Sequence, residues 1–372
     1  GSGRGFLCHY AHALALGLTE IGHCVRLVEG SRDELEGWRT PFDKTACFKA
    51  GWVGWACLAA QVRAFAPDVV HFQWIGDPLT ARLFIAWLKQ RGIATVYTPH
   101  NLLPHRRRWL SQPGFHALYR AFDRIVARDA HIAWGLEEMF GLGGDRVVYL
   151  PGSPNLMAHP EAPRRRAPEL SPKQPGEVRL LYFGHGSHRK GLDHLLAVLA
   201  RGGFPPLVKI VIAGEEVLSG TDPAVLASAR AKVAIEVLER YVDPSEVADL
   251  FTSADLLLMP YAKTCKSPLL DLAGAFALPV LRSDRVEAVR FDEGIHGLTV
   301  SAHNGDALAA ALNTLVASPG RLAAMRQSLA REESVMEAIH RLALGHARLY
   351  ADMTQAARAP ESVPRLAPAI GG

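Results

Sequence analysis

Apolar residues along the chain follow two patterns: short continuous runs, and longer stretches in which they recur every three or four positions. Short runs predict strands buried on both faces of a parallel sheet, and the longer pattern predicts amphipathic helices. In the first half the predicted strands are 24–28, 69–72, 94–98, 131–134 and 146–150. The predicted helices of this half are 6–21, 54–65, 79–91 and 114–127.

The second half repeats the alternation of strand and helix. Its predicted strands are 178–183, 208–213, 255–259, 280–282 and 297–300. Its predicted helices are 192–200, 244–252, 268–276 and 306–316. This alternation predicts two doubly wound, Rossmann-like α/β domains. A length of 372 residues also exceeds the usual size of a single domain.

Breaks in the pattern predict the domain limits. We expect an N-terminal domain over 1–157, a linker rich in proline and arginine over 158–177, and a second domain over 178–335. A helix over 336–357 is expected to return to the N-terminal domain, and 358–372 to form a disordered tail. Because the helical pattern follows a glycine turn at once, we expect the first strand of this half to be missing from the numbered chain.

Composition narrows the class of protein. Residues are 49% hydrophobic and 21% charged, no apolar run is long enough to span a bilayer, and no signal pattern is present. The formal charge of +4 gives no reason to expect nucleic acid as a partner, although it suits a polyanionic ligand or an anionic membrane surface. The five cysteines have no spacing typical of zinc or redox sites, so we expect packing residues in a reducing compartment. These features predict a cytoplasmic protein, free or at the inner face of the membrane.

The strongest local motif is a glycine loop after the strand 178–183. Gly184, His185 and Gly186 form a small-residue turn, Lys190 follows it, and a helix comes next. Backbone N–H groups, a helix dipole and an ammonium group that converge in this way favour a phosphate site. The alternative is an ordinary loop between a strand and a helix, with Lys190 solvated.

A second motif lies between residues 255 and 280. Tyr261 ends an apolar strand, Lys263 and Ser267 lie in a basic loop, and Asp271 follows in the first turns of a helix. A carboxylate in that position is able to accept hydrogen bonds from the two vicinal hydroxyls of a ribose. The alternative is an acid that stabilises the helix dipole.

Three features of the first half lie where the carboxyl ends of its strands are predicted. His100 follows one strand and is a candidate base or sugar ligand, or a histidine bonded to a loop carbonyl. Asp77 follows another strand and is a candidate base or a helix N-cap. Gly3 and Gly5 form an opening turn that allows close approach of a phosphate or sugar.

A basic and apolar segment, 106–110, is a candidate membrane contact. Its sequence is Arg-Arg-Arg-Trp-Leu. Such a mixture suits docking on anionic headgroups, and a solvated loop is the alternative.

Over almost its whole length the chain resembles a GT-B glycosyltransferase of the family 4 type. The resemblance rests on the order of eight segments rather than on any one of them. In chain order they are the glycine turn with 11–28, then 67–71, 98–101, 147–152, 184–191, 241–255, 274–280 and 296–298.

The resemblance implies roles for several residues. Lys190 matches the lysine that binds the donor pyrophosphate, but His185 stands where the family has an arginine. Asp271 matches the second of two glutamates and implies a ribose contact, whereas Lys263 replaces the first and reverses its charge. The segments around Tyr261, Ser267 and 100–105 are similar to a bacterial exopolysaccharide subgroup that resembles GDP-mannose-dependent mannosyltransferases.

The expected function is transfer of a hexose from a nucleotide-diphosphate sugar, with GDP-mannose or a UDP-sugar as donor, to a glycan or lipid-linked oligosaccharide. No cofactor and no metal are expected, because no Asp-x-Asp pair follows a strand. Positive groups on the leaving diphosphate, Lys190 above all, would supply catalysis. The alternatives are a nucleotide-sugar epimerase and a catalytically degenerate GT-B protein that acts as a binding or scaffold protein.

Overall fold

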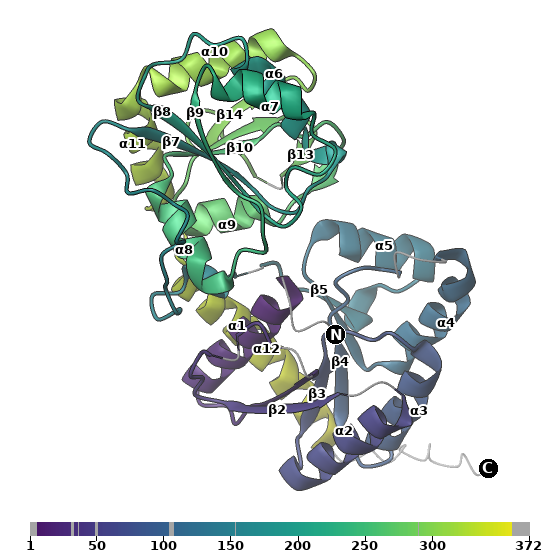
Figure 1. Ribbon diagram of the computed structural model, residues 1–372. Coiled ribbons are helices and arrows are strands. Elements are labelled where there is room, and N and C mark those ends of the chain that lie inside the picture. The colour runs from purple at the N-terminus through teal and green to yellow at the C-terminus, as the bar shows by residue number, and fades with distance from the viewer. Residues whose placement is uncertain are drawn as a thin grey trace, which may run out of the picture.

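The computed structural model describes residues 6–30, 33–35, 37–48, 51–103, 108–152, 154–288 and 290–358. Figure 1 shows two α/β lobes, one above the other. Every strand in both lobes pairs in parallel with its neighbours, and helices pack against the sheets. The parallel α/β class predicted from the apolar runs is therefore confirmed.

The first lobe contains a two-stranded and a four-stranded parallel sheet, with orders β1-β2 and β3-β4-β5-β6. Its strands are β1 (Arg26–Gly30), β2 (Asp43–Phe48), β3 (Val69–Phe72), β4 (Ala94–Tyr97), β5 (Arg124–Ala127) and β6 (Val147–Tyr149). Its helices are α1 (Phe6–Glu20), α2 (Trp52–Phe65), α3 (Pro78–Lys89), α4 (Arg108–Ala121) and α5 (Ala130–Phe140), with short 3₁₀ turns η1 (Gly144–Arg146) and η2 (Leu156–Ala158).

Two predictions for this lobe are wrong. Residues 131–134 lie inside α5 instead of forming a strand, and the strand of this region is β5, which was assigned to the end of a helix. Asp129 explains the change from strand to helix, because its side chain accepts a hydrogen bond from the Ile132 N–H and caps α5. The residues of α5 that are buried include Ile132, Leu136 and Phe140, which is helical spacing. Strand β2 was not predicted.

The second lobe is built on a six-stranded parallel sheet of order β14-β12-β10-β7-β8-β9 and a small sheet β11-β13. Its strands are β7 (Val178–Phe183), β8 (Val208–Ala213), β9 (Ala234–Leu238), β10 (Leu256–Met259), β11 (Cys265–Lys266), β12 (Val280–Ser283), β13 (Val286–Glu287) and β14 (Gly297–Val300). Its helices are α6 (Leu192–Leu199), α7 (Pro223–Arg230), α8 (Pro244–Ser253), α9 (Leu269–Ala275), α10 (Gly305–Val316) and α11 (Pro319–Leu329), with a 3₁₀ turn η3 (His188–Lys190). Among the described elements of this lobe, α7, α11, β9, η3 and the small sheet lie outside the predicted ones.

The strand order of the large sheet reverses direction between β7 and β10. From β7 the chain proceeds outward through β8 to β9, and it then returns to β10 on the other side of β7. Open α/β sheets bind ligands beyond the carboxyl ends of their strands at such a reversal of direction. The glycine loop follows β7 and the Tyr261 loop follows β10, so the topology brings both predicted motifs to this edge.

The last helix, α12 (Val335–Arg358), belongs spatially to the first lobe. It packs against α1, as Figure 1 shows, where Leu342 and Ala343 share a buried cluster with Leu14 and Leu18. Farther along the helix, Leu349 and Met353 cover valines of β4 and β5. The two ends of the described chain are therefore packed together.

The cysteines differ from the prediction. Cys47 of β2 and Cys57 of α2 are joined by a disulfide, so the expectation that all five are separate packing residues is wrong for this pair. Cys8 is buried, Cys24 is exposed and Cys265 is half-buried. Among the described residues no helix combines the length and the apolar character that a membrane span requires.

Candidate functional site

The glycine loop turns sharply at the end of β7. Gly184 has a φ of 118°, a conformation that favours glycine, and its N–H bonds to the Ala213 carbonyl oxygen at 2.9 Å. A Cβ atom on Gly184 would overlap the Lys190 Nζ atom. The ammonium group of Lys190 therefore lies directly on the turn, as a phosphate site requires.

Lys190 is a half-buried cation. Desolvation lowers the pKa of Lys190. Among the described residues no carboxylate opposes this lowering, and the group that does oppose it is Cys265. A positive charge in such surroundings is stabilised when an anion arrives. This arrangement suits a ligand that carries its own negative charge.

His185 lies at the exposed tip of the same turn. Its ring nitrogens are 3.9 Å from a Glu215 carboxylate oxygen and 3.8 Å from one of Glu216. Gly186 packs so tightly beside this acidic pair that a Cβ atom would overlap the Glu216 carbonyl oxygen. The loop therefore follows one narrow path between the ends of β7 and β8.

The loop after β10 is tied to the glycine loop. The Ala262 N–H donates to the Arg189 carbonyl oxygen at 2.8 Å. Tyr261 and Ser267 are buried and their hydroxyl groups lie 3.1 Å apart, and burial raises the pKa of Tyr261 to about 12. Tyr261 and Ser267, both predicted as ligands, thus stabilise the loop by bonding each other. Lys263 is exposed.

Asp271, in the first turn of α9, is close to groups of both lobes. Its side chain reaches solvent, yet the protein around it displaces enough water to raise its pKa. Lys266 and Arg128 oppose that rise, and Asp129 adds to it. Because Arg128 and Asp129 belong to the first lobe, Asp271 stands where the two lobes meet.

An ion pair connects the lobes at this place. Lys266 of β11 contacts Asp129, with Nζ 2.9 Å from the carboxylate oxygen. Burial alone would raise the pKa of Asp129, but the Ile132 N–H and Lys266 hold it below its usual range. Arg128 and Asp129 were missed by sequence reasoning, which placed 114–127 in one helix. The short apolar run of β5, followed by an aspartate able to cap a helix, was the pattern that could have identified these two residues.

The ion pair gives a first prediction. Lys266→Ala should lower the free energy of unfolding by about 0.5 kcal/mol at pH 7, since the pair is partly exposed. The folded-state pKa of Asp129 is depressed, so its stabilisation exists at neutral pH and is lost as the pH falls through that pKa. Urea unfolding at pH 7, at pH 3 and in 1 M salt measures the effect. Lys263→Ala, an exposed neighbour in the same loop, is the control. A difference that persists undiminished at pH 3 would exclude the ion pair as its cause.

His100 occupies the carboxyl end of β4 in the first lobe. It is buried, its Nε2 atom lies 3.1 Å from the Gln73 Oε1 atom, and its ring meets the Tyr10 ring edge-on at 5.2 Å. Burial, aided by nearby Arg128, lowers the pKa of His100 to about 3. A neutral imidazole of such low basicity is better suited to bonding a sugar hydroxyl than to removing its proton.

A partly buried hydrogen-bond chain leads from α12 to His100. The Tyr350 hydroxyl lies 2.6 Å from His71 Nδ1, and His71 Nε2 lies 3.3 Å from the Gln73 side-chain nitrogen. Gln73 in turn contacts His100. The last helix therefore fixes the orientation of a candidate site residue.

The other first-lobe candidates are placed differently. Asp77 caps α3, with one carboxylate oxygen 3.0 Å from the Leu79 N–H and the other 2.7 Å from the Thr80 hydroxyl. Both carboxylate oxygens of Asp77 therefore bond within the first turn of α3, which is the helix N-cap role given above as the alternative to a base. Gly3, Gly5 and the basic residues 106 and 107 lie outside the described residues.

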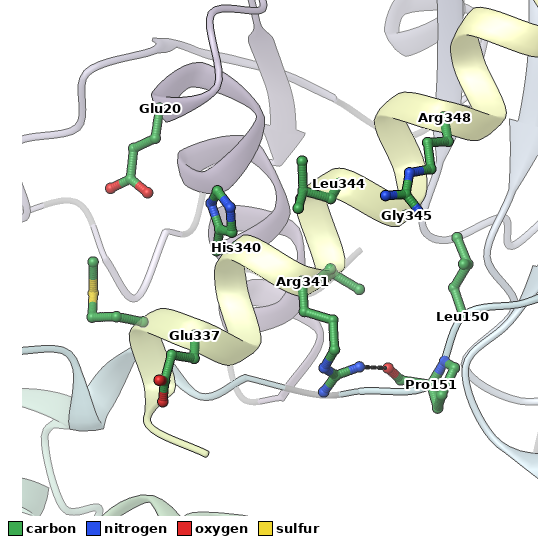
Figure 2. A pocket seen from close by; sticks show the side chains of 11 residues that line it. Glu20, Leu150, Pro151, Glu337, His340, Arg341, Leu344, Gly345 and Arg348 are labelled. Carbon is green, nitrogen blue, oxygen red and sulfur yellow. Dashed lines mark hydrogen bonds between the residues drawn. The ribbon is translucent and has the colours of Figure 1, made fainter.

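A pocket of about 790 Å³ lies elsewhere, between α12, Leu150 and the end of α1. Figure 2 shows Arg341 among the lining residues, where it donates a hydrogen bond of 2.7 Å to the Pro151 carbonyl oxygen. None of the residues predicted from sequence lines this pocket. The candidate site is consequently the edge formed by β7 and β10, together with Arg128 and His100 of the first lobe.

Two family models match this chain. The model described as Glycosyltransferase Family 4 matches residues 9–153, and the one described as Glycosyl transferases group 1 matches residues 177–318. They coincide with the first and the second lobe respectively.

Relatives and solved structures agree with these models. The chain is 26% identical to a D-inositol 3-phosphate glycosyltransferase of Rhodococcus erythropolis, over 64% of this chain and 59% of the relative. It is 26% identical to a GDP-mannose:glycolipid 4-beta-D-mannosyltransferase of Xanthomonas campestris pv. campestris, over 58% and 60%. The matches thus span about 60% of the length of these relatives. Sucrose-phosphate synthase of Thermosynechococcus elongatus is similar in fold, with a TM-score of 0.64, 17% identity and 92% of each chain covered. The predicted GT-B fold is therefore confirmed.

Proposed function

We propose that this chain, a glycosyltransferase by both of its domains, moves a hexose from a nucleotide-diphosphate sugar to a glycan or lipid-linked oligosaccharide. The observation that carries the proposal is the position of Lys190, a half-buried cation folded onto the Gly184 turn at the switch point of the sheet. GDP-mannose or a UDP-sugar is the proposed donor.

The chemistry follows from charge. Cleavage of the bond between sugar and diphosphate places negative charge on the leaving group, and groups that bind this charge most tightly in the transition state accelerate the step. We propose that Lys190 performs that task and that Asp271 accepts hydrogen bonds from a ribose. We propose that no metal ion takes part in this step.

The acceptor is proposed to bind to the first lobe, beside His100 and Arg128. The likeness to a mannosyltransferase that acts on a glycolipid supports a lipid-linked acceptor and work at the inner face of the membrane. We retain the exopolysaccharide subgroup as part of this proposal. His185 and Lys263 depart from the family pattern, and we propose that they select a donor sugar different from that of other family members.

A panel of nucleotide sugars tests the proposal. A donor at a hundred times its dissociation constant should raise the free energy of unfolding by about 2.7 kcal/mol, which thermal unfolding detects. UDP-, GDP-, ADP- and dTDP-sugars are compared, with free hexoses as controls. The proposal fails if no member of the panel stabilises the protein.

Product analysis then separates the alternatives. Transfer to a lipid-linked acceptor supports the proposal. Conversion of the sugar with donor alone would identify an epimerase, and tight binding without turnover on any acceptor would identify a binding or scaffold protein.

A further inference from the structure

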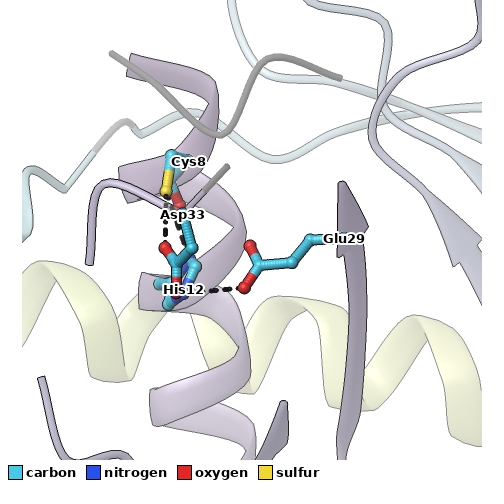
Figure 3. A group of neighbouring side chains, drawn as sticks. All are labelled: Cys8, His12, Glu29 and Asp33. Carbon is cyan, nitrogen blue, oxygen red and sulfur yellow. Dashed lines mark hydrogen bonds and ion pairs between the residues drawn. The ribbon is translucent and has the colours of Figure 1, made fainter. Parts of the chain in front are cut away.

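Four side chains with metal-binding atoms gather in the first lobe, away from the glycine loop. Cys8 and His12 lie one turn apart on α1, Glu29 comes from the end of β1, and Asp33 follows it. One ligand atom from each lies within 4.8 Å of the others. Figure 3 shows the four groups pointing toward one another.

His12 presents a free nitrogen to the centre of this cluster. Its Nδ1 atom lies 2.9 Å from the Cys8 carbonyl oxygen, which makes Nδ1 the protonated nitrogen and leaves a lone pair on Nε2. Nε2 is buried and has no hydrogen-bond partner among the described residues. Leaving such an atom unpaired is costly unless it serves as a ligand.

The distances within the cluster suit a shared cation. His12 Nε2 is 3.7 Å from Asp33 Oδ1 and 3.9 Å from Glu29 Oε1, and Cys8 Sγ is 3.6 Å from Asp33 Oδ1. Both nitrogen–oxygen separations are too long for hydrogen bonds. Ligands arranged tetrahedrally around zinc lie about 3.3 to 3.5 Å apart, so a bound ion would draw each of these three pairs together by up to about half an ångström. The remaining pairs of ligand atoms lie within 4.8 Å of one another.

The charges of the cluster balance when a divalent cation is present. A Cys8 thiolate with Glu29 and Asp33 carries three negative charges, and Lys44, which is ion-paired with Asp33, supplies one positive charge. The net negative charge that remains is equal in size to the positive charge of one divalent ion. Without a divalent ion, burial and then Asp33 raise the pKa of Glu29 to about 7 although Lys44 acts in the opposite direction, and burial raises the pKa of the Cys8 thiol.

We propose that Cys8, His12, Glu29 and Asp33 form a structural zinc site that fastens α1 to the carboxyl end of β1. A set of one sulfur, one nitrogen and two carboxylate oxygens suits zinc rather than magnesium or calcium, which prefer oxygen alone. Four protein ligands fill a tetrahedral shell, which is typical of a structural site. Binding would release the Cys8 proton to solvent.

Metal titration tests this proposal on the full chain. Protein freed of metal by a chelator should bind one equivalent of Zn²⁺, measured by calorimetry, and become more stable to heat. Replacement by Co²⁺ should give the absorption of a thiolate-to-cobalt charge transfer together with the intense visible bands of a tetrahedral ion.

Variants assign the ligands. Cys8→Ser should abolish the charge-transfer absorption, and Glu29→Gln, of equal shape, should weaken Zn²⁺ binding at least about tenfold, the loss seen for even an outer-shell partner. Cys24→Ser and His23→Ala, which alter exposed residues near the end of α1, are the matched controls and should bind as the parent does. Should Cys8→Ser misfold, the Glu29→Gln titration still decides.

Three results would overturn the proposal. They are the absence of stoichiometric Zn²⁺ binding, charge-transfer absorption that survives in Cys8→Ser, and Zn²⁺ affinity unchanged in Glu29→Gln.

Discussion

Replacement of Lys190 by alanine is expected to lower the affinity for a nucleotide-diphosphate sugar, and kcat/KM, by roughly 10- to 150-fold. The reason is the loss of a charge-assisted hydrogen bond to phosphate, worth about 1.5–3 kcal/mol. Calorimetric titration gives the affinity and initial rates give kcat/KM. Lys232→Ala is the control, since this exposed lysine precedes β9 at the opposite edge of the same sheet.

The ligand series makes the Lys190 experiment sharper. The loss should be large for a nucleoside diphosphate and absent for the nucleoside, because the ammonium group lies on the glycine turn where we propose that the phosphates bind. Equal losses for both ligands would point to a damaged fold, and unchanged kinetics would remove Lys190 from the site.

Gly186→Ala is expected to abolish measurable donor binding while the remainder of the fold survives. A methyl group at this position would overlap the Glu216 carbonyl oxygen, and a backbone group is unable to rotate away as a side chain does. The loop must shift, at a cost of about 1–3 kcal/mol of stability. Donor titration and urea unfolding measure the two effects separately.

Gly320→Ala provides the matched control for Gly186→Ala. Gly320 lies near the start of α11 with open space where the methyl group would be, so alanine should be neutral or slightly stabilising. If Gly186→Ala bound the donor as tightly as this control, the narrow path of the loop would have no role in binding.

The sequence located the loops around the candidate site better in the second lobe than in the first, for a physical reason. The glycine loop is a local feature: a buried strand, a turn of small residues and a helix start all lie within a few residues of Gly184. Arg128 and Asp129 gave no comparable signal, because β5 is only four residues long and follows closely on α4. Asp129 is important because it pairs with Lys266, and Arg128 because its charge is close to Asp271. Neither relation is encoded in a local pattern.

Side-chain direction is a second feature that spacing along the chain does not predict. Tyr261 and Ser267 are in the predicted loop, but they point into the protein and bond each other. The cluster of Cys8, His12, Glu29 and Asp33 shows the same limit, since half of it comes from α1 and half from the end of β1. Spacing along the chain identified the loops, whereas packing decides which atoms of each loop reach a ligand.

The packing of α12 has a consequence for biosynthesis. Leu349 and Met353 cover Val96 and Val126, so the first lobe lacks part of its apolar interior until the last helix arrives. Domains usually fold as units, the N-terminal one first, while the chain is still being made. Here the ribosome releases the covering residues after the entire second lobe has been synthesised. Of the two lobes, the one that is translated first is therefore the one that completes its folding last.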